Sequence, residues 1–209
     1  MQEAVLTIKE SIYSIWFALF IFFSGFCFSY MVNLFNIKFL KWFPVWFVRV
    51  MSRFINPRAG FMKIFLIIFL FNSISIAIYM LSGLFVILPL IIAFLTGMNV
   101  GLTVFIPPRE TMEGYEPGRT YRDSNIIRMI VFSTFVMVIE MVIFSVALGM
   151  GISLGISVSA VSAADPSAST GAAMYIADLL FQRLNAYFLI CVPALAVSAY
   201  MEAVIIKGA

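Results

Sequence analysis

The chain has 209 residues, of which 63% are hydrophobic and 11% are charged, with a net charge of +3 and a mean hydropathy of +1.08. A soluble domain is nearer half apolar and a quarter charged, so this composition excludes an ordinary soluble domain and is typical of a chain that crosses a membrane several times. The sequence contains no histidine, which removes Ser-His and Cys-His catalysis and histidine-based zinc sites. We therefore expect no enzyme, no metal or cofactor and no nucleic-acid partner, with membrane lipid as the surrounding medium.

The first predicted element is the apolar stretch at residues 12–34. It lacks the basic start and the closing Ala-x-Ala of a signal peptide, so we expect a retained span. Four later stretches also have the roughly 20 apolar residues that a span requires, at 61–81, 84–106, 126–148 and 187–206. The sequence thus predicts one membrane domain over residues 1–209, an all-α bundle of about five transmembrane helices.

The segment 36–56, between the first two predicted spans, carries its basic residues along one side of a helical wheel. Pro44 is expected to divide it into two short pieces. We expect an amphipathic segment lying on the anionic cytoplasmic leaflet, the alternative being an ordinary basic connection that only sets the topology. The predicted membrane-interface residues are Lys38, Lys41, Trp42, Trp46, Arg49 and Arg53.

Lysine and arginine predict the orientation, because they are enriched in cytoplasmic loops. In a five-span topology, eleven of the 13 basic residues fall on one side and only Lys9 and Arg183 fall on the other. This bias predicts an outside N-terminus and a cytoplasmic C-terminus, in a multi-pass protein of the cell membrane. The polar stretch at 107–125 then lies in the cytoplasm as a solvated loop, with docking of a partner as the alternative.

Small residues at four-residue spacing predict close helix packing, because they let two backbones approach each other in lipid. From Ala147 onward such residues continue past the fourth predicted span, which therefore either runs on beyond Leu148 or breaks at its glycines and re-enters. The same stripe predicts a homodimer, and residues 165–171 are expected to form the external turn. The predicted packing residues are Gly97, Gly101, Ala147, Gly151 and Gly155.

Glu140 lies near the middle of the fourth predicted span. An ionised carboxylate costs at least about 2.5 kcal/mol at such a position, so Glu140 is expected to face the bundle. It is either a neutral acid bonded to a neighbouring helix, the partner of a cation, or part of the wall of a water-filled path. Asn72 and Asn99 either form separate hydrogen bonds between helices or join Glu140 in a shared polar site.

A set of motifs between residues 57 and 206 has a familiar spacing. Its members are Phe61-x-x-x-Phe65, Asn72, Leu81-Ser82-Gly83, Pro89, Gly97-x-x-x-Gly101 and Glu140 followed by Gly149, Gly151 and Gly155. This pattern resembles the stage II sporulation protein M family of integral membrane proteins. The family's His-Gly pair falls here on Val136 and Met137, and Thr96 stands where asparagine is usual. In sporulating bacteria the resemblance implies a membrane anchor for cell-wall-degrading partners.

Two functions follow from these features. The first is a non-enzymatic scaffold or assembly subunit, which associates through small-residue helix faces with a second copy or with another membrane or cell-envelope protein. The alternative is a transporter or channel component in which Glu140, Asn72 and Asn99 line a polar pathway. The sequence has no clear internal repeat, which weakens the second hypothesis.

Overall fold

A computed structural model of the chain describes residues 2–42, 46, 50, 54, 59–85, 87–105, 123–164 and 169–208. Of these residues 95% are helical and none lies in a strand, so the predicted all-α class is confirmed. The elements in chain order are α1 (Gln2–Glu10), α2 (Ile12–Leu34), α4 (Phe61–Leu81), the 3-10 turn η1 (Ser82–Leu84), α5 (Leu88–Phe105), α7 (Asp123–Ala164), α8 (Ser169–Ala186), the π-helical turn η2 (Tyr187–Cys191) and α9 (Val192–Gly208).

Four helical stretches are long and apolar enough to cross a membrane, which indicates a membrane protein. They are Ile12–Leu34, Phe61–Leu84, Ser133–Val161 and Ala173–Lys207. The predicted boundaries 12–34 and 61–81 coincide with α2 and α4. The third predicted span, 84–106, starts later than expected because η1 occupies Ser82–Leu84, and its described apolar part is a shorter helix, Leu88–Leu102.

The last two predicted spans are parts of much longer helices. α7 has 42 residues, which at 1.5 Å per residue is about 63 Å, or roughly twice the 30 Å hydrocarbon core of a bilayer. The helix therefore runs on past Leu148, as the first of the two alternatives predicted. The helical path from Ser169 to Gly208 is also unbroken, so the predicted span 187–206 covers only its second half.

The start of that predicted span coincides with the π-helical turn η2. Pro193 follows η2 within α9 and has no backbone N–H to donate. A proline ring also crowds the carbonyl four residues before it, here that of Leu189, and a widened turn relieves this clash without ending the helix.

The helices of the bundle run in two opposite directions. Ile64 of α4 clusters with Ala203 of α9, and Ile76 clusters with Leu195, so these two helices are antiparallel. By the same comparison α7 is parallel to α4 and antiparallel to α9, and α2 is parallel to α5. One end of the bundle therefore contains the end of α2, the start of α4 and the end of α9, and it is called here the Phe61 end. The opposite end contains η1 and is called the Gly83 end.

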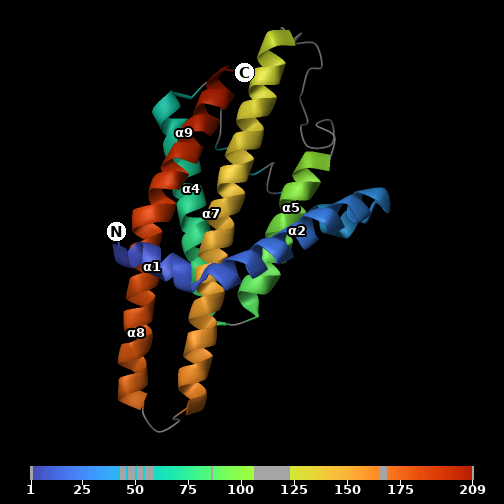
Figure 1. Ribbon diagram of the computed structural model, residues 1–209. Helices are drawn as coiled ribbons and strands as arrows, with labels where there is room; N and C mark the ends of the chain where they lie inside the picture. The colour runs from blue at the N-terminus through green and yellow to red at the C-terminus, as the bar shows by residue number, and fades with distance from the viewer. Residues whose placement is uncertain are drawn as a thin grey trace.

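The long helices give the molecule its shape. Figure 1 shows α4, α7 and the α8–α9 path standing alongside one another, with α2 crossing α7 obliquely. α7 and α8 continue together past the Gly83 end of α4. This projecting pair, residues 154–164 and 169–182, is called the α7–α8 arm.

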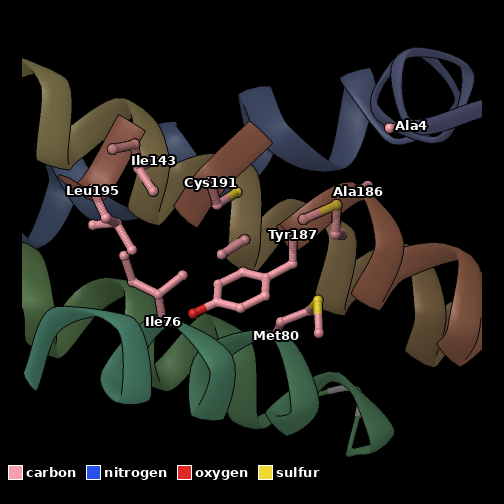
Figure 2. Packing of buried hydrophobic residues seen from close by; sticks show 10 residues of the cluster. Ala4, Ile76, Met80, Ile143, Ala186, Tyr187, Cys191 and Leu195 are labelled. Atoms are coloured by element: carbon pink, nitrogen blue, oxygen red, sulfur yellow. The ribbon is translucent and has the colours of Figure 1, made fainter. Parts of the chain in front are cut away.

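The largest buried cluster joins α4, α7, η2 and α9 (Figure 2). Tyr187 of η2 lies at its centre, with its ring directed toward α4 and its hydroxyl donating to the Ser73 carbonyl oxygen at 2.7 Å. Ile76, Met80 and Leu195 are fully buried around it. The cluster holds the middle of the helical path from α8 to α9 against α4.

Glycines bring α2 and α5 into backbone contact. A Cβ atom on Gly97 would overlap the carbonyl oxygen of Phe22, and one on Gly25 would overlap the carbonyl oxygen of Phe94. A Cβ atom on Gly101 would overlap the Ser29 hydroxyl. The predicted packing residues Gly97 and Gly101 thus face α2, where this spacing permits the close approach.

The first part of the small-residue stripe of α7 is buried within the chain. Ala147 belongs to the cluster around Tyr187, and Gly155 is buried. Gly151 lies against Gly83 of η1, where a Cβ atom would be 2.8 Å from the Met80 carbonyl oxygen. Ser159, farther along the stripe, is exposed, and the homodimer stays a prediction.

The end of α2 is fixed by Asn36, whose φ of 50° is left-handed. The Ile37 N–H donates to the Val32 carbonyl oxygen at 3.0 Å, which is the longer hydrogen bond of a Schellman motif. Lys41 then donates to the side-chain oxygens of Asn33 (2.9 Å) and Asn36 (3.1 Å). These hydrogen bonds hold the predicted interface lysine against the end of α2.

Much of the predicted interfacial segment lies outside the described residues, including Pro44, Arg49 and Arg53. Residues 38–42 are helical, Lys38 is exposed, and the exposed rings of Trp42 and Trp46 stack at 6.2 Å. Most of the predicted loop at 107–125 and the start of the predicted turn at 165–171 also lie outside the described residues.

Candidate functional site

Three helices each contribute one polar side chain to a common point inside the bundle. The Asn72 amide of α4 donates to Glu140 Oε1 of α7 at 2.7 Å. The Ser198 hydroxyl of α9 donates to the same oxygen at 3.2 Å. Glu140 is therefore bonded to two neighbouring helices, an arrangement that agrees with the first of its three predicted states.

This site lies at mid-depth of the bundle. Asn72 is 11 residues from the start of α4 and nine from its end, or about 16 Å and 14 Å along the axis. At that depth there is no bulk water to compete for the donors and acceptors. Hydrogen bonds between membrane helices contribute on average about 0.6 kcal/mol and at most about 1.7 kcal/mol, so the site ties the helices together modestly.

The second carboxyl oxygen of Glu140 differs from the first. Both hydrogen bonds go to Oε1, and within the described part of the chain Oε2 accepts none. Glu140 also lines a cavity of about 270 Å³ between α2, α5 and α7, whose other eight lining residues are phenylalanine, methionine or valine. Glu140 is the one titratable residue of this lining; its carboxyl group is bonded to α4 and α9, and the wall itself is almost wholly apolar.

A second acid lies close by on α9. Glu202 is one helical turn beyond Ser198 and is near enough for its charge to interact with that of Glu140. Both side chains are half-buried. Among the described side chains, no lysine or arginine pairs with either acid.

The predicted shared site is assembled in part. Asn72 and Glu140 meet, whereas Asn99 lies half-buried on α5 and supplies neither of the hydrogen bonds that Glu140 accepts. Ser198 takes the third position, and sequence reasoning missed it. The available signal was its spacing from Glu202, because residues four apart share one face of a helix.

Arg183 forms a second buried polar contact that the sequence did not reveal. Its side chain is only 2% exposed. One guanidinium nitrogen donates to the Thr7 carbonyl oxygen of α1 at 3.2 Å, and the other donates to Ser153 Oγ of α7 at 3.1 Å. Glu10 interacts with the guanidinium electrostatically. Arg183 thereby joins α1, α7 and α8 at the Gly83 end, where the arm begins.

Comparisons with protein-family models, with curated proteins and with solved structures find no match for this chain. The resemblance to the stage II sporulation protein M family therefore stays a prediction.

Proposed function

We propose that the protein is a non-enzymatic membrane scaffold or assembly subunit whose partner-binding surface is the α7–α8 arm. The observation that carries the proposal is the continuation of α7 and α8 past the Gly83 end of α4. The arm also presents large apolar side chains. Met174 is 68% exposed and Phe181 is 72% exposed.

The orientation belongs to the same proposal. With five membrane crossings, the basic residues Lys38, Lys41, Lys63 and Lys207 gather at the Phe61 end, which is then cytoplasmic. The arm consequently projects on the outside of the cell membrane. A cell-envelope protein, or a second copy of the chain in a homodimer, is therefore the expected partner, as the family resemblance also implies.

The buried polar contacts support a scaffold because they fix the arm to the bundle. Arg183 holds the base of the arm to α1, and the hydrogen bonds of Glu140 hold the same two long helical paths together at mid-depth. A partner bound to the arm is thus anchored to the membrane through a rigid connection.

Site-specific photocrosslinking in native membranes tests this proposal. A photoreactive residue is placed at Met174 or Phe181 on the arm, or at Ile74 or Ile78 on α4, which are exposed to similar extents (59% and 55%). We expect discrete protein adducts from the arm positions alone, identified by mass spectrometry as an envelope protein or a second copy. Equal adduct patterns from α4 and the arm would contradict the proposal.

A second candidate function, a transporter or channel component, rests on one observation, an acidic residue inside the bundle, Glu140, whose carboxyl group is bonded to two other helices. Intramembrane acids are typical of proton and ion pathways. Its test compares proton and ion flux in liposomes that contain wild-type protein or Glu140→Gln. Flux that is lost only in the variant supports transport, whereas equal background flux excludes it for those ions.

A further inference from the structure

The helices α2 and α7 diverge on one side of their crossing. They meet where Ile15 packs against Gly149 and where Ala18 clusters with Leu148. Because α2 crosses α7 obliquely (Figure 1), the two helices separate beyond this contact, as α2 continues toward its C-terminal end. The cavity of about 270 Å³ lies in the angle between them, and Val100 of α5 completes its lining.

The lining of this cavity offers no group that would hold water or an ion. Glu140 belongs to the lining, but its carboxyl group is bonded to α4 and α9. An apolar cavity without polar partners stays free of water, so a molecule that fills this one is itself apolar. Besides Val100 and Glu140, the lining residues are Phe22, Phe23 and Phe26 of α2 and Met137, Val138, Met141 and Phe144 of α7.

The cavity has a buried wall and an exposed mouth. Phe22 is only 2% exposed, whereas Phe23 and Val138 are each 44% exposed. Phe23 is 11 residues from either end of α2, about 16 Å along the axis. The hydrocarbon core of a bilayer is roughly 30 Å thick, so the mouth faces the middle of the lipid phase, where the hydrocarbon chains of the two leaflets end.

We propose that this cavity binds the end of a single hydrocarbon chain of a membrane lipid. The driving force is packing, because the lining atoms of an empty cavity lack van der Waals partners and the cost grows with the volume left unfilled. A volume of about 270 Å³ is just below the usual range of roughly 300–1,000 Å³ for ligand pockets, so one chain end fits and a whole lipid does not. The headgroup of that lipid stays at the membrane surface.

This site is separate from the α7–α8 arm and goes beyond the scaffold proposal. Photolabelling of the full chain in nanodiscs tests it, with a phosphatidylcholine that carries a diazirine on the last carbon of one acyl chain. A second phosphatidylcholine carries the diazirine beside the acyl carbonyl group, near the headgroup. Peptide mass spectrometry should find adducts at Met137 and Met141 with the first probe and about threefold fewer with the second, which reacts nearer the membrane surface.

Two valine variants of α7 locate the bound chain. Val138→Phe narrows the mouth of the cavity and should lower the adducts at Met141 about threefold, because the ring takes the place of chain carbons. Val142→Phe is the matched control, because Val142 is 51% exposed, lies one turn farther along α7 and is outside the lining, so the adducts should stay unchanged.

If Val138→Phe does not fold, the two probes on the wild-type protein still decide. The proposal is overturned if neither methionine is labelled, as expected for a cavity that is empty or covered by a second copy of the chain. It is also overturned if the two probes label the methionines equally, or if a folded Val138→Phe gives the same adducts as Val142→Phe.

Discussion

Replacing Gly97 by alanine is expected to separate α2 from α5. The added Cβ atom would overlap the Phe22 carbonyl oxygen and would lie 2.8 Å and 3.1 Å from its carbonyl carbon and Cα. Ordinary van der Waals contact begins near 3.4 Å, and all three obstructing atoms are backbone. No side-chain rotation relieves the clash, so the two helices must move apart.

The size of the effect follows from two opposing contributions. Overpacking of this kind costs about 1–3 kcal/mol, while alanine is a better helix former than glycine by up to about 1 kcal/mol. The expected net loss in the free energy of unfolding is therefore about 1–2 kcal/mol. Gly25→Ala introduces the reciprocal clash with Phe94, and the double variant should lose less than the sum because one displacement accommodates both methyl groups.

Unfolding in mixed micelles of a mild detergent and SDS, followed by circular dichroism, measures this loss. Gly60→Ala is the matched control, because nothing lies within 4 Å of a Cβ atom there and its φ of −61° suits alanine. A Gly97→Ala protein that unfolds at the same SDS fraction as Gly60→Ala would refute the backbone contact between α2 and α5.

Three further substitutions or reactions test other parts of the fold. Arg183→Met should lower the free energy of unfolding by about 2–3 kcal/mol, because it leaves the Thr7 carbonyl oxygen and Ser153 Oγ without a charged donor. Arg183→Lys should lower it by about half as much. The same SDS titration measures both variants. A double-mutant cycle of Asn72→Ala and Glu140→Ala should give a coupling energy of about 0.6–1.7 kcal/mol, and a coupling of zero would refute the 2.7 Å hydrogen bond. N-ethylmaleimide in mild detergent should label the exposed Cys27 and spare the buried Cys191 until the protein is unfolded, as peptide mass spectrometry would detect.

Hydropathy predicted two helices at their observed bounds because polar residues or glycine end the apolar stretches abruptly. Asn36 follows α2, and Gly60 precedes α4. It could not predict the length of α7, since residues 149–164 are mainly glycine, alanine and serine, which are only weakly apolar and are poor or average helix formers apart from alanine. These glycines stay helical because η1 and α2 pack directly on them, and such tertiary contacts are invisible in the local sequence.

The candidate site likewise contains residues that the sequence predicts and contacts that it does not predict. Glu140 and Asn72 stand out as polar residues in apolar helices, but their meeting depends on the register between α4 and α7, which the sequence does not specify. Ser198 carries little signal because serine is common in membrane helices. From the sequence, Arg183 is only one charge in the topology count. Its burial depends on α1 lying beside α8, which the local sequence does not reveal.

The bond between Arg183 and Thr7 joins residues 176 positions apart, and this separation has a consequence for biosynthesis. At roughly 5–20 residues per second, a ribosome needs about 9–35 s to synthesise that length of chain. During this time α1 has neither its arginine nor the rest of α8 to pack against. Although α1 is made well before α8, it is thus secured only afterwards, and a nascent chain stalled before α8 would leave α1 undocked.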